Sequence, residues 1–371
     1  MPLEAEYRRF VREHGVATLF GDEPPGEVDT GDPERAIRQL EAARRYTSYA
    51  TVGTEPRLEW LSRLGTVASR KGPYQGPIVR SLRETLGRRA EDVRRGTERL
   101  GLPWPAVHVD LFPTGDLNAM SVPVPGGQLV LVNTGLMSLV FEVLKIHVLS
   151  QPIGPGAEEG ALVAEPQVEL LLAEALNAYV YGAGSWMTWS TPPLEGRRRD
   201  LVAPTLGVCE DFVLAHEIGH VLAGDRDGAR FLSAPADAPV PGLHVPVAGH
   251  EAEFAADRVG AEVVLAALGV DAAIGPADER SLWAGLLFFF VIDEAVRAAT
   301  SRLDGPAPVA THPGAPERTE RLVTAFPPRH DTSLTLVHAF GAWFEHYLPG
   351  AVAHIEEVNH TIARRAEPWW R

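Results

Sequence analysis

Cysteine is scarce in this sequence, which excludes one class of fold. Cys209 is the only cysteine among the 371 residues, so no disulfide can form within the chain. Small secreted domains held together by several disulfides are therefore excluded. The N-terminal segment MPLEAEYRRFVREHG also lacks the apolar stretch of a secretory signal. These two features together predict a cytoplasmic protein.

Long apolar runs are missing as well. The most apolar segment, Leu282 to Ile292, is much shorter than the roughly 20 residues that a helix needs to cross a bilayer. Asp293 and Glu294 follow it directly. We expect a buried helix here and no membrane span.

Basic residues are outnumbered by acidic ones, with 34 Lys and Arg against 49 Asp and Glu. The resulting net charge of -15 disfavours nucleic acid and anionic membranes as partners, because both repel an acidic protein. Hydrophobic residues make up 45% of the chain, which is enough to build a large core and argues against disorder. The composition predicts a globular enzyme-like protein.

The hydrophobic pattern predicts an α+β fold that is mainly α-helical. Two β-like runs, VHVDLF (107–112) and QLVLVN (128–133), lie on either side of a Pro-Gly turn, and we expect a small antiparallel sheet. Residues 305–328 are expected as a proline-broken connection. Helical periodicity predicts helices over residues 33–46, 78–100, 138–149, 165–181, 210–224, 250–268, 277–303 and 334–364.

This pattern divides the chain into three regions. Residues 1–104 are expected as a helical region packed on the core, and residues 105–330 as the core itself, with a helical insertion at about 138–205. Residues 331–371 form a C-terminal helical segment. The residues that can carry chemistry lie in the core, on the two predicted helices 210–224 and 250–268.

His216 and His220 are four residues apart on the first of these helices, so both imidazoles project from one face and can share a tetrahedral zinc ion. This is the HExxH arrangement. Glu217 lies about 100 degrees further round the helix, where its carboxylate can approach a zinc-bound water without becoming a ligand. The spacing predicts one Zn²⁺ per chain, with Glu217 as the general base.

Spacing alone does not fix the third zinc ligand. The second helix offers His250, Glu251, Glu253 and Asp257. Glu253 and Asp257 lie one turn apart on the same face, so one could bind zinc while the other accepts the N–H of a ligating histidine. We assign zinc to Glu253 and the supporting role to Asp257, with His250 as the alternative ligand.

A helix with two ordinary histidines is the alternative interpretation of the HEIGH sequence. The apolar flanks 212–214 and 221–222 argue against it, because paired histidines on a buried helix need a partner. Gly219 supports the same conclusion. Glycine inside a helix costs about 1 kcal/mol relative to alanine, and the close approach of another backbone would explain its presence.

Four separated segments resemble peptidase family M48, the gluzincin metallopeptidases that include the CAAX prenyl proteases and the HtpX heat-shock protease. They occur in the order that the family shows. The resemblance implies a zincin-like metallopeptidase core with an HExxH active-site helix. The segments are LNAMSVPVPGGQLVLVNTGLM (117–137), VLAHEIGHVLAGD (213–225), EFAADRVGA (253–261) and THPGAPERTERL (311–322).

The resemblance also implies roles for individual residues. The ExxxD pattern of the family supplies the third zinc ligand at its glutamate, which corresponds to Glu253, with Asp257 as the accompanying aspartate. The HPxxxxR motif corresponds to His312, Pro313 and Arg318. His312 would stabilise the oxyanion of a tetrahedral intermediate or, alternatively, cap or pack a helix, and Arg318 would lie behind the zinc ligands.

The NAxxxPGG segment of the family precedes a strand at the lip of the cleft. An extended substrate can add to such an edge through main-chain hydrogen bonds. Five residues rather than three separate Ala119 from Pro125 in this chain. The expected substrate-binding residues are Asn118, Ala119 and Met120.

The expected function is a zinc-dependent metalloendopeptidase that hydrolyses a peptide or protein substrate. Zinc would activate a water, and Glu217 would accept its proton and later return it to the amine. Two alternatives stay open: a zinc hydrolase of a dedicated non-protein amide or small substrate, and a catalytically silent, zinc-stabilised interaction protein. Glu217 argues against the silent protein, because a structural zinc site closes its fourth position with a further ligand.

Overall fold

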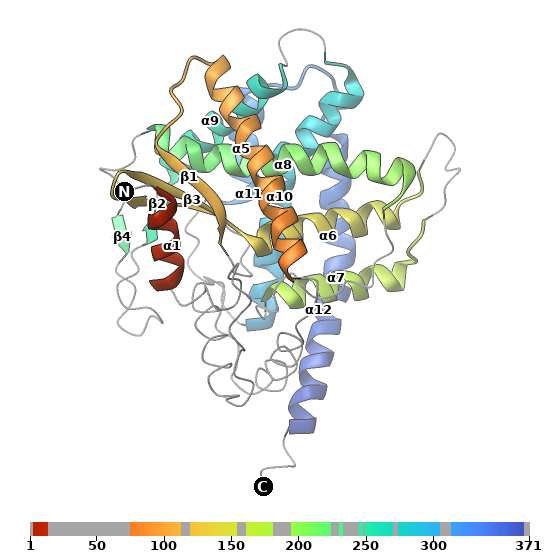
Figure 1. Ribbon diagram of the computed structural model, residues 1–371. Helices are drawn as coiled ribbons and strands as arrows, with labels where there is room; N and C mark the ends of the chain where they lie inside the picture. Colours follow the sequence, from red (N-terminus) through yellow and green to blue (C-terminus); the bar gives the residue numbers. More distant parts are fainter. Residues whose placement is uncertain are drawn as a thin grey trace.

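A computed structural model gives the fold (Figure 1). It describes residues 3–13, 75–112, 119–153, 161–180, 194–223, 230–232, 245–247, 249–269, 274–304 and 313–366. The helix expected over 33–46 lies outside these residues, as do Asn118 and His312. The described part is mainly α-helical with a small sheet, which confirms the predicted α+β class.

The described elements follow one another along the chain in the order α1, α5, β1 to β3, α6 to α8, β4, β5 and α9 to α12. The helices are α1 (Leu3–Glu13), α5 (Gln75–Arg99), α6 (Thr134–Ser150), α7 (Glu165–Val180), α8 (Gly196–Ala223), α9 (His250–Leu268), α10 (Pro276–Asp304), α11 (Ala315–Ala325) and α12 (Thr335–Ala366). The strands are β1 (Val107–Phe112), β2 (Ala119–Val124), β3 (Gly127–Asn133), β4 (Arg230–Leu232) and β5 (Val245–Val247).

Helix α8 lies at the centre of the molecule. It runs across the upper half of Figure 1, above α6, and it contacts α5, α6, α9, α10, β2 and β3. A helix with neighbours on all sides is apolar on all sides, and Phe212, Leu214 and Ile218 are all fully buried. The helix begins well before the predicted residue 210. Pro204 lies inside it, at a position where the sequence would suggest that a helix ends.

The three-stranded sheet has the order β1-β3-β2. Strands β2 and β3 form a hairpin in which Val124 pairs with Gly127, and Gly126 takes the positive φ of 93° that this tight turn after Pro125 requires. The predicted antiparallel pairing of the runs 107–112 and 128–133 is therefore wrong, because β1 pairs with β3 in parallel, and the antiparallel partner of β3 is β2, which was not predicted. The reason is that β2 lies between β1 and β3 along the chain. The chain therefore reverses direction twice on the way from β1 to β3.

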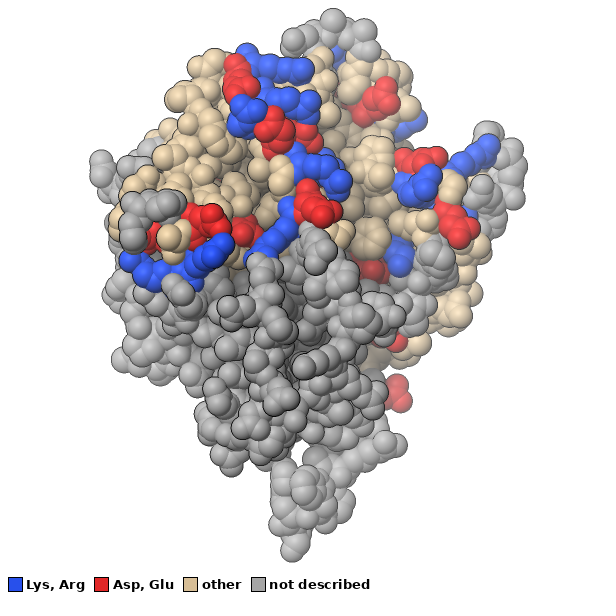
Figure 2. All heavy atoms as spheres, in the orientation of Figure 1, with Lys and Arg blue, Asp and Glu red and all other residues tan. Residues whose placement is uncertain are grey.

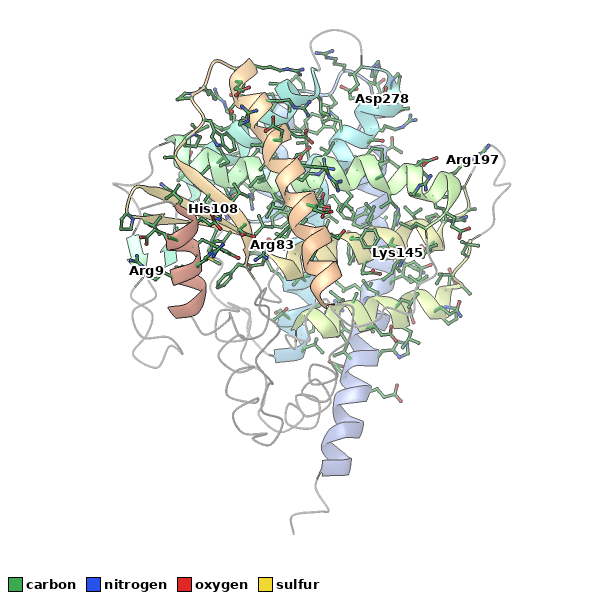
Figure 3. All side chains as sticks on the ribbon, in the orientation of Figure 1. Arg9, Arg83, His108, Lys145, Arg197 and Asp278 are labelled. Carbon is green, nitrogen blue, oxygen red and sulfur yellow. The ribbon has the colours of Figure 1, made fainter. Side chains whose placement is uncertain are left out.

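The two faces of the sheet have different neighbours. Val130 and Val132 face the main core, whereas Leu129 and Leu131 face α1, which contributes Tyr7 and Phe10 to a second small apolar cluster. The Tyr7 hydroxyl donates to the Leu111 carbonyl at 2.8 Å. Figure 3 labels Arg83 and His108 at this junction of α1, α5 and β1, where Arg83 Nε donates to Asp110 at 3.0 Å. The sheet is thus fixed between α1 and the helical core.

Helix α5 contacts α8, α9 and β1. Figure 2 shows basic and acidic side chains alternating along its outer surface, and several of them pair within the helix, such as Arg94 with Glu91 and Glu98. Its inner surface carries Val93, which is fully buried. At its end, the Arg99 guanidinium donates to the last carbonyls of α9, at 2.7 Å from that of Ala266. Helix α5 therefore supports the second of the two chemistry-bearing helices.

Helices α6, α7, α10 and α12 pack against one another and complete the core. These four helices begin and end close to the predicted positions. The expected proline-broken connection over 305–328 is wrong in part, because α11 lies within it. Pro316 stands in the first turn of α11, where its missing N–H has no intrahelical partner to lose. None of the described helices is long and apolar enough to cross a membrane.

Candidate metal centre

Three side chains from α8 and α9 meet in the interior. His216 and His220 come from α8 and Glu253 from α9, and one ligand atom of each lies within 4.8 Å of the other two. The two Nε2 atoms are 3.1 Å apart. The Glu253 carboxylate oxygens lie 3.4 Å from each of them, Oε2 from His216 and Oε1 from His220. It is the only such group of His, Cys, Asp and Glu among the described residues.

These distances fit a single tetrahedral ion. Two atoms held 2.0 to 2.1 Å from one zinc ion at the tetrahedral angle are about 3.3 to 3.4 Å apart. The two histidine nitrogens are 3.1 Å apart, and each lies 3.4 Å from a different carboxylate oxygen of Glu253, which is close to that value. Two imidazole nitrogens and one carboxylate oxygen also match the ligand types of catalytic zinc sites. The residues present therefore fit a zinc ion with one position left for water or substrate.

Two glycines bring the ligand-bearing helices together. A Cβ on Gly219 of α8 would lie 3.0 Å from the carbonyl oxygen of Ala256 on α9. A Cβ on Gly260 of α9 would lie 3.0 Å from the backbone nitrogen of His216. The close approach predicted from Gly219 is therefore confirmed, and it is matched by a second glycine on the facing helix. Larger residues would separate Glu253 from the two histidines.

Asp257 fixes the orientation of His216. Their Nδ1 and Oδ1 atoms are 2.9 Å apart. Because an ionised carboxylate can only accept, His216 Nδ1 carries the proton and donates it. The lone pair of the neutral imidazole is then on Nε2, the atom that faces His220 and Glu253. Asp257 thus lies one hydrogen bond from His216 and outside the group of three, and its role as the support of a zinc ligand stays a prediction.

Arg318 of α11 holds Asp257 in turn. Its Nε donates to Oδ2 at 2.8 Å and its Nη2 to Oδ1 at 2.5 Å, a bidentate pair. The guanidinium also lies over the ring of Phe290 on α10, 4.3 Å from its centre. Both partners of the pair are buried. Burial opposes ionisation of Asp257, but the hydrogen bonds from Arg318 and His216 outweigh it and hold the pKa of Asp257 below its usual value.

The pKa of Glu217 is raised by burial, while the neighbouring His216 and His220 oppose the shift. A carboxylate with a raised pKa is a stronger base than an exposed one. Burial would by itself lower the pKa of His216, but its hydrogen bonds to Asp257 and Glu253 raise the pKa to about 10 in the metal-free protein. The pocket therefore favours a positive charge between these carboxylates, whether a proton or a metal ion supplies it.

No protein-family model, curated protein or solved structure matches this chain. The site is therefore interpreted from its own geometry.

Strand β2 carries two of the three predicted substrate-binding residues. It contacts α8, and its second edge has no pairing strand among the described residues. Ala119 is buried against the main core, whereas Met120 packs on the opposite face of the sheet with the α1 cluster. The side chains of both residues therefore pack on the sheet, and their role in substrate binding stays a prediction. Asn118 precedes the described strand.

The other predicted site residues lie in different places. Glu253 lies with the histidines, whereas His250, the alternative ligand, is exposed at the start of α9 and outside the group. His312 lies outside the described residues, and its predicted role stays a prediction. Phe290 was not predicted, since an apolar residue in a long apolar run carries no signal that a guanidinium will stack on it.

Proposed function

We propose that this protein is a zinc-dependent metalloendopeptidase of the M48 type. The observation that carries the proposal is the group of His216, His220 and Glu253, in which the histidine nitrogens are 3.1 Å apart and each lies 3.4 Å from a Glu253 carboxylate oxygen. Glu217 stands directly beside the first ligand. A site with only three protein ligands and an adjacent base is typical of hydrolytic rather than structural zinc.

When bound, the zinc ion supplies a Lewis acid that polarises the substrate carbonyl and makes water more acidic. The protein's own side chains transfer the protons and orient the ligands. Glu217 accepts a proton from the attacking water and returns it to the leaving amine, a task that its raised pKa favours. Asp257 and Arg318 keep the His216 ring turned so that Nε2 faces the ion.

An extended peptide is the substrate class that the neighbourhood of the site favours. The outer edge of β2 offers main-chain donors and acceptors beside α8, and a peptide strand could pair with them. A small-molecule amide would make no use of such an edge. Hydrolysis of a dedicated non-protein amide is therefore the second candidate, and a silent zinc-stabilised interaction protein is the third.

The test begins with metal content. We expect the purified protein to hold one zinc ion per chain and to hydrolyse members of an unbiased peptide library, with activity lost to a chelator and restored by zinc. Glu253→Ala should lose both zinc and activity, whereas His250→Ala, which alters the same helix turn at an exposed position, should keep both. Zinc retained in Glu253→Ala but lost in His250→Ala would contradict the ligand assignment. A wild-type protein without zinc would contradict the proposal itself.

A further inference from the structure

The first turn of α9 carries a metal ligand but has no capping side chain of its own. Glu253 is the fourth residue of the helix. Gly249 occupies the N-cap position and makes no side-chain hydrogen bond to the helix. The first N–H groups of a helix lack intrahelical partners, and here the carbonyl of Gly249 accepts those of Ala252 and Glu253 at 2.9 and 3.1 Å. Without a side-chain cap, contacts from another element add to the order of this turn.

Arg321 of α11 makes these contacts on both sides of Glu253. Its guanidinium carbon lies 3.6 Å from the ring centre of Phe254, the residue that follows Glu253. Its Nη1 and Nη2 also donate to the carboxylate of Glu251, at 3.3 and 3.2 Å. Nη2 is shared with Glu317 of its own helix at 3.3 Å. One side chain thus joins α11 to two residues of the first turn of α9.

The two contacts differ in strength. The Glu251 side chain is 83% exposed, so its ion pair with Arg321 is screened by water and contributes little. The ring of Phe254 is buried, and a guanidinium stacked on a buried ring is held more firmly. The stack on Phe254 is therefore the contact that decides how well the turn is ordered.

We infer that Arg321 is a positioning residue for Glu253. Its stack on Phe254 orders the first turn of α9 and so holds the Glu253 carboxylate against the two histidines. Arg318, three residues earlier on α11, holds Asp257 one turn further along the same helix. Helix α11 thereby fixes one metal ligand and the support of another. The inference rests on the proposed metal site for its consequence, but the ordering of the turn can be measured without metal.

The test compares Arg321→Ala with Arg258→Ala. Arg258 is an exposed arginine of α9 that pairs with Glu262 at 3.2 Å, so its removal is a matched loss of one exposed ion pair. Zinc affinity is measured by competition with a chelator well below the unfolding temperature, and amide hydrogen exchange is measured on the metal-free protein. We expect Arg321→Ala to weaken zinc binding about tenfold and to speed exchange only at the hydrogen-bonded amides of residues 252–254. Arg258→Ala should change neither.

Two further variants distinguish the contribution of the Phe254 ring from that of the Arg321 guanidinium. Phe254→Leu should weaken zinc binding as Arg321→Ala does, and the double variant should be no weaker than either single one, because both remove the same contact. Arg321→Lys should restore only part of the affinity, since the ammonium group cannot stack as a plane.

The outcomes distinguish a failure of the positioning role of Arg321 from a failure of the proposed function. Zinc affinity equal to wild type in Arg321→Ala, or faster exchange along the whole of α9, would overturn the inference and leave the proposed function intact. A wild-type protein that takes up no zinc would contradict the proposed function. In that case, faster amide exchange in Arg321→Ala that is confined to the first turn of α9 would support the ordering role of Arg321. Amide exchange equal to that of the wild type would overturn it.

Discussion

Arg318 is the residue on which the geometry behind the metal centre depends most. Its guanidinium joins α11 to Asp257 on α9 and to Phe290 on α10, and Asp257 in turn orients His216. All of these side chains except the Phe290 ring are charged or polar, and all are buried. Removing one partner of a buried ion pair leaves the other without compensation, which costs about 3 to 5 kcal/mol.

We therefore expect Arg318→Met to reduce both stability and zinc affinity. Methionine keeps much of the apolar stem but leaves the Asp257 carboxylate unpaired. The free energy of unfolding should fall by ~3 kcal/mol in a denaturant titration, and zinc binding should weaken by roughly ten- to a hundredfold. Arg302→Met, at an exposed position of α10, is the control. Equal losses in the two variants would contradict the role given to Arg318.

The sequence predicts the ligands at this scale but not their surroundings. The HExxH spacing indicates His216, Glu217 and His220, because helical geometry alone puts the two histidines on one face. The choice of Glu253 over His250 depends on where α9 begins relative to α8, which no local pattern encodes. The contact of Arg318 with Phe290 is likewise a product of packing between helices far apart in sequence.

At the scale of elements, the crossing of α8 and α9 carries the site. Gly219 and Gly260 let the two backbones approach, each facing the other helix at a distance where a methyl group would press on main-chain atoms. Either substitution would move the helices apart by a few tenths of an ångström. Glu253 would then lie further from His216 and His220, which weakens the binding of one shared ion.

We expect Gly219→Ala and Gly260→Ala to weaken zinc binding and to lower the unfolding temperature. Alanine raises helix propensity by about 1 kcal/mol, so any loss of stability reflects the steric conflict. Gly87→Ala is the matched control, because nothing lies within 4 Å of a Cβ at that position of α5, and it should raise the unfolding temperature. A gain of stability in all three variants would show that the crossing of α8 and α9 has space for a methyl group, which would contradict this expectation.

The elements themselves follow from the sequence to different degrees. Long periodic helices such as α9 and α10 are predicted well, since their apolar residues recur at helical spacing. The early start of α8 was not predicted because its first turns are largely polar and exposed and contain Pro204, which suggests a helix end. Strand β2 gives only a weak signal, with Pro123 inside a short run, and missing it led to the wrong direction for β1.

At the scale of the whole molecule, an unusual charge cluster joins α5 to α8. Arg89 lies between Glu210, at 3.2 Å, and Asp211, at 3.3 Å, with Asp92 nearby on its own helix at 3.5 Å. Burial raises the pKa values of Glu210 and Asp211 to about 7, although Arg89 opposes the shift. One arginine thus faces more carboxylates than it can neutralise.

This cluster predicts a pH dependence of stability. Exposed carboxyl groups in the unfolded chain titrate near pH 4, so between about pH 4 and pH 7 the folded protein binds more protons than the unfolded chain. The contribution of these groups to the free energy of unfolding therefore falls as pH rises through this window. The free energy of unfolding is measured by denaturant titration from pH 5 to pH 8. In Glu210→Gln it should fall by ~2 kcal/mol less over this range than in the wild type.

Glu320→Gln provides the control, because Glu320 is exposed on α11. Its pH profile should overlay that of the wild type. A Glu210→Gln profile with the same slope as the wild type would show that the buried cluster does not take up protons in this range.

The central claim is that His216, His220 and Glu253 hold a zinc ion for hydrolysis in which Glu217 is the base. The most direct test measures zinc content and peptide hydrolysis together for the wild type and for Glu217→Gln. The account predicts one zinc ion per chain in both proteins and a rate at least about a hundredfold lower in the variant, since glutamine keeps the shape of the side chain but cannot accept the proton. Zinc-dependent hydrolysis at the wild-type rate in Glu217→Gln would contradict it.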